Sequence, residues 1–406
     1  MKIIVLKFGG TSVGSLKKIK NVARIIISYV KKKYKVIVVS SVMSGVTNEL
    51  LSKTQNIAKN FPKEEKDVIL STGEQIACAL IAGKLKDLGF KSRSWLGWQI
   101  PIVTRGNYSS SRIIKIQKKN IINYLKEGGI PIITGFQGIN SDFRITTLER
   151  GGSDTSAILC AKFFKADKCI IFTDVRGVYT TDPNLTKSAK KIEKISYEEM
   201  LEMASLGAKV MQPASIQEAR LNRIEIDVKS TFSKKDGTII TKKKNILSKN
   251  TIRGISFTKN DAKLTLVGVK DKPGVAASIF KPLYESSINV DMVVQNISAV
   301  GRETDLTFTV KLEDLNKTRK LIEKNKSIKF KKLIINKNVS KVSIVGVGMI
   351  TTPGVTFRMF QALAKKKINI EVISTSEIKI SVLINKKNLK KSVEILHQEF
   401  KLSNSL

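Results

Sequence analysis

The chain opens with the stretch Ile3-Ile4-Val5-Leu6-Lys7-Phe8-Gly9-Gly10-Thr11-Ser12. The apolar run predicts a buried strand, and the glycine pair after it predicts a tight turn into a helix. Glycines let a backbone approach a phosphate closely, and N–H groups at a helix N-terminus favour an anion. Lys7 would then bring a positive charge to the phosphates. The spacing does not fit a Walker A loop, so a tight turn beside a surface lysine explains this segment alone equally well.

Outward from this stretch, strand-like apolar runs alternate with amphipathic segments through the first part of the chain. This alternation is typical of an α/β domain with a largely parallel sheet. Further strands are predicted at residues 35–40, 130–134, 169–173 and 224–229, and helices at residues 17–30, 71–88 and 154–164. A lysine-rich polar stretch at residues 233–250 then predicts a linker.

The last third of the chain is an internal repeat with a constant offset of 80 residues. The matching triplets are Val267-Gly268-Val269 with Val347-Gly348-Met349, Pro273-Gly274-Val275 with Pro353-Gly354-Val355, and Ile288-Asn289-Val290 with Ile368-Asn369-Ile370. Two copies are too few for a solenoid and indicate a duplicated small domain. Each copy is predicted to run strand, Pro-Gly turn, helix, strand, strand, helix, which is the ferredoxin-like βαββαβ order. Chance similarity of Pro-Gly turns is the weaker alternative, because several matches share one offset.

The composition excludes several classes of protein. With 406 residues, the chain exceeds what one hydrophobic core usually organises, so two or three domains are expected. The formal net charge of +38 comes mostly from scattered lysines, aromatic residues make up only 6%, and no nucleic-acid motif is visible. We therefore interpret the charge as a solvated surface and expect no specific nucleic acid partner. No apolar run approaches the ~20 residues of a membrane span, and the N-terminus is typical of a strand rather than a signal peptide, so no membrane partner is expected.

Cysteine and histidine are too few to suggest a metal site. Cys78, Cys160 and Cys169 lie far apart, and His397 is the single histidine. None of them has the spacing of metal ligands, so no protein-bound metal and no disulfide are predicted. Free cysteines fit a reducing cytoplasm.

A second motif, Ser71-Thr72-Gly73-Glu74, is predicted to open a helix with Glu74 in its first turn. Ser71 stands three residues before Glu74, which is the spacing of a capping box. The structural interpretation is therefore a capping glutamate. The functional interpretation is a carboxylate directed at a substrate ammonium group.

The most informative motif is Leu148-Glu149-Arg150-Gly151-Gly152-Ser153-Asp154-Thr155-Ser156. Arg150 can grip a carboxylate with two parallel hydrogen bonds, and Asp154 can accept from an amine. Together with Glu74 this provides both signs of charge for a zwitterionic amino acid. Capping of the following helix by Ser153 or Asp154 is the alternative, but it leaves Arg150 and the two glycines unexplained.

A further motif, Thr173-Asp174-Val175-Arg176-Gly177-Val178-Tyr179-Thr180-Thr181-Asp182-Pro183, follows a predicted buried strand. A carboxylate at a strand end, a glycine turn and a tyrosine suit a nucleotide at the carboxyl edge of a parallel sheet. Tyr179 could equally be a core anchor with a hydrogen-bonded hydroxyl group.

These motifs, with Gly135-Phe136-Gln137-Gly138, resemble those of the aspartate kinases in order and spacing, over nearly the whole chain. The repeat, with Asp271-Lys272-Pro273-Gly274 and Ile373-Ser374-Thr375-Ser376-Glu377, is similar to the tandem ACT domains of those enzymes. The resemblance implies an α/β fold: a three-layer α/β/α amino acid kinase (carbamate kinase-like) domain at residues 1–245, and two ferredoxin-like ACT domains at residues 246–335 and 336–406.

The activity implied by the resemblance is transfer of the γ-phosphate of ATP to aspartate, which yields 4-phospho-L-aspartate and ADP. This is the first step of lysine, threonine and methionine biosynthesis, and it uses Mg²⁺ carried by the nucleotide. The implied catalytic residues are Lys7, Ser41 and Asp154, and the implied aspartate-binding residues are Thr47, Glu74, Arg150 and Ser153. The implied ATP-binding residues are Lys7, Phe8, Gly9, Gly10, Thr173, Asp174, Tyr179, Lys209 and Val210. In the family an arginine usually follows the Asp-Pro pair; here it is Asn184, which puts one nucleotide contact in doubt.

The ACT pair implies feedback inhibition by lysine, threonine or both, and a homo-oligomer formed through the ACT domains. The implied effector residues are Asp271, Ala276, Asn289, Val290, Gln295, Thr352, Val355, Asn369 and Ile370. A pair that serves only to dimerise the chain is an alternative. A kinase for glutamate or acetylglutamate and a catalytically inactive amino-acid sensor are alternatives for the whole chain, and non-specific DNA binding is an alternative explanation of its charge.

Overall fold

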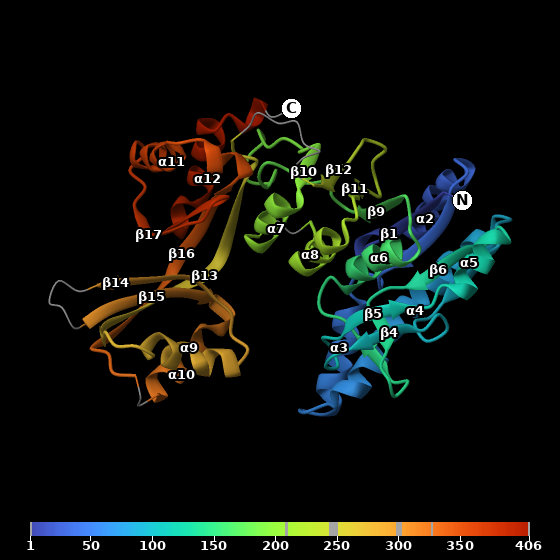
Figure 1. Cartoon of the computed structure of the whole chain (residues 1–406), viewed down its shortest axis with the longest axis horizontal. Coiled ribbons are helices and arrows are strands. Elements are labelled where there is room, and N and C mark those ends of the chain that lie inside the picture. Colours follow the sequence, from blue (N-terminus) through green and yellow to red (C-terminus); the bar gives the residue numbers. More distant parts are fainter. Residues whose placement is uncertain (1, 208–209, 243–250, 298–302, 326–327, 405–406) are drawn as a thin grey trace.

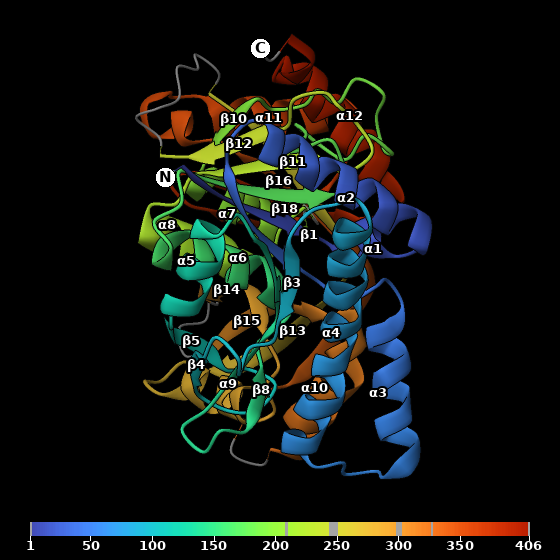
Figure 2. The same cartoon turned by 90° about the vertical axis from the view of Figure 1, so that its right-hand side faces the viewer.

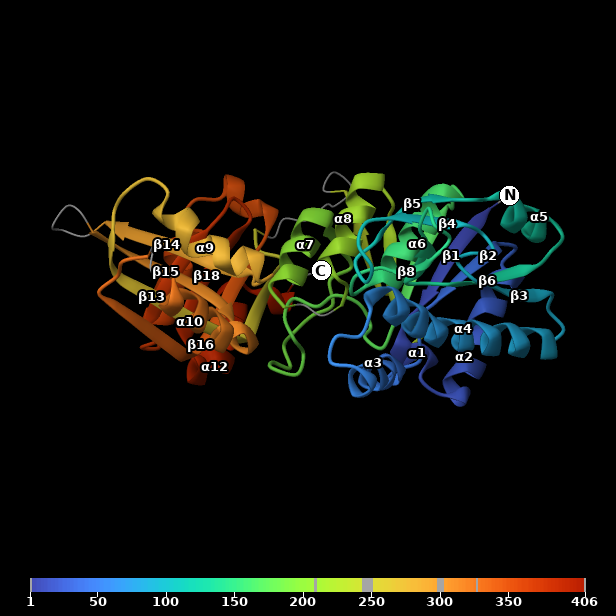
Figure 3. The ribbon, with the colours of Figure 1, turned by 90° about the horizontal axis from the view of Figure 1, so that it is seen from below.

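A computed structural model describes residues 2–207, 210–242, 251–297, 303–325 and 328–404. The predicted kinase domain lies on the right of Figure 1, and the two repeated units lie on the left, one above the other. Seen from below, the molecule is elongated, with helices α7 (Tyr197–Ser205) and α8 (Pro213–Asn222) between the two parts (Figure 3).

The kinase domain is built on a large sheet with the strand order β10-β12-β11-β9-β1-β2-β6-β3. The strands from β11 to β3 run parallel to one another, and β12 is antiparallel to β11. Their bounds are β1 (Ile3–Phe8), β2 (Lys35–Ser40), β3 (Ser92–Trp95), β6 (Ile130–Thr134), β9 (Lys168–Thr173), β10 (Lys194–Ser196), β11 (Ile226–Ser230) and β12 (Thr238–Thr241).

Helices cover both faces of this sheet, so the predicted α/β/α sandwich is confirmed. Apolar residues in α2 (Leu16–Lys31) recur at the helical spacing Ile19, Val22, Ala23 and Ile26, and this stripe packs on one face together with α4 (Lys63–Asp87). Helix α6 (Gly152–Phe163) packs on the other face. Figure 2 shows α2 and α4 on one side of β1 and α6 on the other. The remaining helices of the domain are α1 (Gly10–Val13), α3 (Val46–Ile57) and α5 (Lys119–Lys126).

A small sheet of order β5-β4-β7-β8 extends the kinase domain beside α4. Its strands are β4 (Ile102–Arg105), β5 (Arg112–Ile116), β7 (Gln137–Ile139) and β8 (Ile145–Thr147). Strand β8 leads directly into the turn before α6, so this sheet controls where that turn lies.

Two local predictions for the kinase domain are wrong. Helix α4 begins at Lys63 and not at residue 71, because Glu64 and Glu65 form its first turn and the apolar pattern continues backwards through Leu70. The predicted linker at residues 233–250 contains strand β12, in which Ile240 is fully buried. Two isoleucines suffice for a four-residue strand once a neighbouring strand supplies its hydrogen bonds, and this short signal was hidden by the surrounding lysines.

Helix α4 also has the length and hydropathy of a membrane span, as the only such helix among the described residues. A core helix of a soluble protein passes the same test, and half of the apolar window of α4 is buried against its own domain. The sequence-based expectation that no stretch comes close to a membrane span was therefore too strong for this segment.

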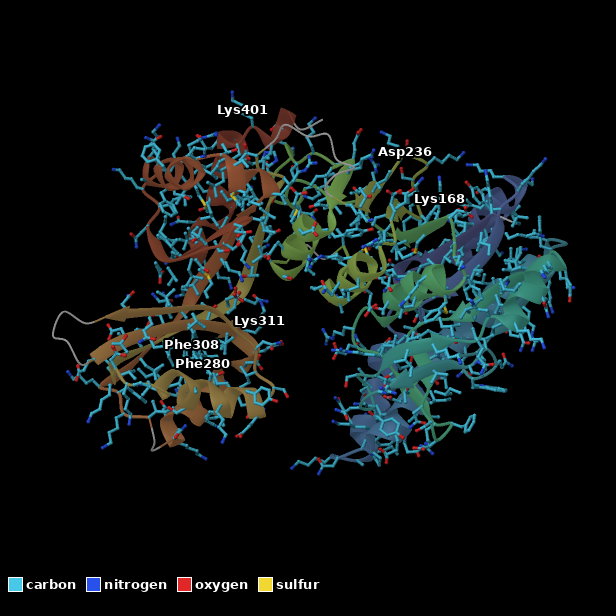
Figure 4. All side chains as sticks on the ribbon, viewed as in Figure 1. Lys168, Asp236, Phe280, Phe308, Lys311 and Lys401 are labelled. Carbon is cyan, nitrogen blue, oxygen red and sulfur yellow. The ribbon has the colours of Figure 1, made fainter. Side chains whose placement is uncertain are left out.

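The two repeated units share one sheet of order β14-β15-β13-β16-β18-β17. The first unit contains β13 (Gly254–Lys270), α9 (Val275–Glu285), β14 (Val290–Ile297), β15 (Glu303–Lys311) and α10 (Leu315–Lys324). The second contains β16 (Lys332–Val345), α11 (Val355–Ala364), β17 (Ile370–Thr375), β18 (Lys379–Asn385) and α12 (Leu389–Glu399). Each unit has its own apolar core, and in the first of them Phe280 and Phe308 meet edge to face (Figure 4).

Strands β13 and β16 are long because each serves both units. Residues 261–270 of β13 pair with β15, whereas residues 254–258 pair with the part of β16 that also pairs with β18. The second unit therefore takes its fourth strand from residues 254–258, at the start of the first. The prediction that residues 336–406 contain every strand of the second unit is therefore wrong. Residues 254–258 are part of the second unit, because they pair with its strand β16.

The second unit also packs directly on the kinase domain. Ile255 N–H donates to the carbonyl oxygen of Thr180 at 2.6 Å, and Val347 N–H donates to the buried carboxylate of Glu199 at 3.2 Å. An ion pair joins Lys379 to Glu202 at 3.0 Å. This junction places the second repeated unit, rather than the first, against the elements that follow β9.

Candidate active site

The predicted site residues gather at the carboxyl ends of neighbouring parallel strands. Gly9 follows β1, Ser41 follows β2 and Asp174 follows β9, and these strands are adjacent in the order β9-β1-β2. The chain leaves β1 toward β2 on one side, whereas β9 lies on the other, so the strand order reverses at β1. In open α/β sheets, ligands bind in the crevice at such a reversal.

Lys7 reaches this crevice because of strand alternation. Ile4, Leu6 and Phe8 pack on the face covered by α2 and α4, so Lys7 points to the opposite face, toward α6. There its Nζ lies 2.6 Å from Oδ1 of Asp154, in the first turn of α6. Both residues are only 8% exposed, so water screens the pair weakly.

The glycine turn after β1 touches the loop that follows β2. A Cβ atom on Gly10 would lie 2.9 Å from the carbonyl oxygen of Val42, which only a glycine tolerates. Ser41 N–H donates to the carbonyl oxygen of Phe8 at 3.0 Å, and Ser44 N–H donates to that of Gly10 at 3.2 Å. These contacts hold Ser41, and Thr47 in the first turn of α3, beside the turn.

Glu74 lies in the middle of α4 and caps nothing. The predicted capping box is wrong, because Ser71 is also inside the helix and donates its hydroxyl to Val68. Glu74 is 2% exposed; its Oε1 accepts from Val42 N–H at 3.1 Å, and its Oε2 has no hydrogen-bond partner. Burial raises the pKa of this carboxyl to about 8, against the lowering effects of its hydrogen bonds and of Lys7. A buried, half-satisfied carboxylate at this edge is suited to an ammonium group.

The start of α6 is formed by glycine and not by a capping side chain. The N-cap residue is Gly151, at φ +81°, and neither Ser153 nor Asp154 makes a capping hydrogen bond. The capping interpretation of these two residues is therefore wrong. Their side chains remain available to the crevice, and Arg150, just before the glycines, is exposed in the turn after β8.

Sequence reasoning missed Asp67, which connects α4, the helix that carries Glu74, to the end of β8, just before Arg150. Asp67 is fully buried in α4, seven residues before Glu74, and accepts four hydrogen bonds. The donors are the backbone and hydroxyl groups of Ser109, at 2.8 and 2.7 Å, and of Thr147, at 2.7 and 2.8 Å. Thr147 ends β8, three residues before Arg150. The signal was an aspartate on the buried face of an apolar helix, where a charge needs partners.

The residues predicted to bind the nucleotide fall into three groups. Thr173, Asp174 and Tyr179 lie at and after the end of β9, and Tyr179 pairs with Lys191 across the following loop. Phe8 is fully buried and stacks on Phe172 on the α2 and α4 face of the sheet, so its ring cannot line the crevice. Val210 is half-buried against the core beside α6 and α8, and Lys209 lies outside the described residues.

The predicted effector residues do not form one site within a unit. In the first unit, Asp271 and Ala276 follow Lys270, which pairs with Glu303, whereas Val290 pairs with Val310. Glu303 and Val310 are seven residues apart along β15, so Asp271 and Val290 lie roughly 20 Å apart along the sheet. In the second unit, Thr352 and Val355 follow the end of β16, and Ile370 begins β17 at the other end. Asn289, Gln295 and Asn369 are exposed.

Comparisons with known proteins match both parts of the chain. The amino acid kinase family model matches residues 2–230, and an ACT domain model matches residues 264–325 and 342–400. An aspartokinase from Bacillus sp. (strain MGA3) is 42% identical over 100% of this chain and 98% of its own. An aspartate kinase from Pseudomonas putida is 44% identical over 99% of this chain and 98% of its own.

The fold is also that of a solved structure. E. coli aspartokinase III in complex with aspartate and ADP superposes with a TM-score of 0.80, covering 98% of this chain and 99% of that chain, at 24% identity. The kinase fold, the ACT pair and the full-length identity agree. The chain therefore belongs to the aspartokinases, the aspartate kinases of the amino acid kinase family.

Proposed function

We propose that the chain transfers the γ-phosphoryl group of ATP to the side-chain carboxylate of L-aspartate, giving 4-phospho-L-aspartate and ADP. The observation that carries this proposal is the buried Lys7–Asp154 pair beside Glu74, at the strand-order reversal of the sheet. Membership of the aspartokinases supports aspartate as the acceptor.

Aspartate would bind through both charges of its amino acid group. The free Oε2 of Glu74 would accept from the α-ammonium group, and Arg150 would hold the α-carboxylate with two parallel hydrogen bonds. Asp67 keeps the two residues at a constant separation, because it joins α4 to the end of β8. The hydroxyl groups of Ser41, Thr47 and Ser153 would make the remaining contacts with aspartate.

The reacting carboxylate needs no general base, because its pKa of about 3.9 leaves it ionised at neutral pH. One of its oxygens forms the new bond to the γ-phosphorus, and the bond from that phosphorus to the β–γ bridging oxygen breaks, leaving ADP. Catalysis then consists of positioning and of neutralising phosphate charge. Lys7 supplies a positive charge, Asp154 holds its ammonium group in place, and Mg²⁺ would arrive with the nucleotide.

The nucleotide would occupy the β9 side of the crevice. Thr173 and Asp174 end the strand next to β1, and the loop that carries Tyr179 follows them. The N–H groups of Gly10 and Thr11, the first two residues of α1, have no intrahelical partner and face the same edge. They would donate hydrogen bonds to phosphate oxygens beside Lys7.

The experiment that tests this proposal is a coupled ADP-release assay with aspartate, in which hydroxylamine traps the acyl phosphate. We expect ADP release that depends on aspartate and yields the hydroxamate. ATP binding without aspartate-dependent turnover would favour an inactive amino-acid sensor, and turnover with glutamate instead of aspartate would favour a related kinase.

The pH dependence of aspartate capture should follow Glu74. In the free protein, burial raises the pKa of Glu74 to about 8, so the carboxyl is mostly neutral at pH 7 and must ionise to bind an ammonium group. We expect kcat/KM for aspartate to rise about tenfold per pH unit below pH 8, since this parameter reports the free enzyme. kcat should change less, because bound ammonium keeps Glu74 ionised. A kcat/KM that is flat from pH 6 to pH 8 would exclude this role.

We further propose that lysine, threonine or both bind the ACT pair and inhibit the kinase, and that the chain forms a homo-oligomer through these units. The positions of the effector residues support ligand binding between units, because Asp271 and Ala276 lie at one end of the first unit and Val290 lies at the other. Millimolar lysine or threonine is expected to lower turnover, with arginine and serine as control amino acids. Asn289→Ala and Asn369→Ala occupy matching positions of the repeat, so the variant that loses inhibition identifies the responding unit. No response to either amino acid would contradict the proposal.

A further inference from the structure

His397, the single histidine of the chain, is fully buried at the junction between the second ACT unit and the kinase domain. It lies near the end of α12, and both ring nitrogens face hydroxyl groups of the kinase domain. Nε2 lies 2.9 Å from Oγ1 of Thr180, and Nδ1 lies 3.2 Å from Oγ of Ser188. One imidazole thus connects two points of the kinase domain that are eight residues apart in the sequence.

Both hydroxyl groups belong to the loop between β9 and β10 that carries Asp174 and Tyr179. Within this loop, Thr180 N–H donates to Lys190 at 2.8 Å, and Lys190 N–H donates to Oγ1 of Thr180 at 3.0 Å. The carbonyl oxygen of Thr180 accepts from Ile255 of the second ACT unit. Thr180 is therefore held by its own loop from one side and by the ACT unit from the other, and it is the neighbour of Tyr179.

Burial of an imidazole is costly unless both nitrogens have partners, and an apolar residue would fill the same space more cheaply. Burial also lowers the pKa of His397, so the ring is neutral at pH 7 and one nitrogen donates while the other accepts. A neutral ring with one donor and one acceptor fixes the two loop segments relative to each other, which a side chain that only packs cannot do.

We infer that His397 is a positioning residue for the nucleotide: from the second ACT unit it holds the Tyr179 loop in the shape that receives ATP. This inference rests on the proposed ATP site. It gives the second ACT unit a direct mechanical connection to that site, since a movement of α12 displaces Thr180 and Ser188 together. The first ACT unit has no such contact among the described residues, because its helices α9 and α10 lie away from the kinase domain (Figures 1 and 3).

The kinetic test compares His397→Gln with a control at the same junction. We expect His397→Gln to raise KM for ATP about fivefold to tenfold, the effect of one or two misplaced hydrogen bonds, with kcat and KM for aspartate nearly unchanged. Lys379→Gln breaks the ion pair with Glu202 on α7 and leaves both ring contacts of His397 in place, so KM for ATP should stay unchanged. If His397→Gln folds poorly, Ser188→Ala removes one hydroxyl partner while α12 stays intact. Equal rises in both KM values, or none, would overturn the inference.

A spectroscopic test needs no turnover. Because the chain has one histidine, the imidazole ¹⁵N signals of the full-length protein require no assignment. Saturation with ADP is expected to shift both signals, with a midpoint equal to the Kd for ADP measured by calorimetry. ADP binding without a shift would overturn the role of His397 but leave the proposed function intact. Failure to bind ADP at all would refute the proposed function itself.

Discussion

The variant Lys7→Ala is expected to lower kcat by at least ~10²-fold, the scale of losing one preorganised charge contact to a transition state. Lys7 is the cation that β1 directs into the crevice, and its Nζ approaches the glycine turn, where a Cβ atom on Gly9 would lie 3.4 Å away. Phosphoryl transfer without a general base depends on such a charge. Trapping the acyl phosphate with hydroxylamine at saturating ATP and aspartate measures the loss.

The fold should survive this change, as circular dichroism and thermal unfolding can check. Asp154 would lose its partner, but its place in the first turn of α6 still favours a negative charge. Lys168→Ala is the matched control: Lys168 begins β9, beside β1 but at the opposite edge of the sheet, and is exposed (Figure 4). Turnover of Lys7→Ala within a few-fold of the parent would remove Lys7 from the mechanism.

Glu74→Gln is expected to reduce kcat/KM for aspartate by roughly 10²-fold or more, since loss of one partner of a buried charge pair costs 2–5 kcal/mol. Glutamine has nearly the same shape and can still accept from Val42 N–H, so the change removes the charge and little else. The pH dependence of kcat/KM described above should disappear in this variant. KM for ATP should stay close to the parent value.

Stability separates this prediction from a structural role for Glu74. Burial disfavours the charged form of Glu74, so the neutral amide should unfold at the same temperature as the parent or a higher one. Glu65→Gln, on the exposed side of the same helix, is the control and should leave aspartate kinetics unchanged. A large loss of stability with an unchanged kcat/KM would show that Glu74 supports the fold and not the substrate.

Much of the kinase domain could be predicted from local patterns. The strands at Ile3–Phe8, Lys35–Ser40 and Ile130–Thr134 have the predicted bounds, because each is a buried apolar run bounded by polar or glycine residues. The duplicated unit was visible as well, since a constant offset is independent of any structural model. The resemblance of the motifs to aspartate kinases was confirmed by relatives of full length.

The wrong sequence-based predictions share one physical cause. A capping or strand-pairing signal in the sequence is ambiguous until the residues that it contacts in the fold are known. Ser71 and Glu74 have capping spacing, yet they lie inside the helix because α4 begins at Lys63, eight residues before Ser71. Thr238–Thr241 is too short to be predicted as a strand, but it is stabilised by hydrogen bonds to β10 and β11. Strand β12 thus depends in part on β10, which lies roughly forty residues earlier in the chain.

The sequence alone determined the fold class, the family and the residue types of the site, because apolar periodicity and glycine placement are local properties. Tertiary structure decided which of these residues meet. It placed Lys7 on Asp154, left one oxygen of Glu74 without a partner, connected α4 to β8 through Asp67, and completed the second ACT unit with residues 254–258. These contacts span from about eighty to about one hundred and fifty residues, and their energies depend on burial and distance, which no local pattern contains.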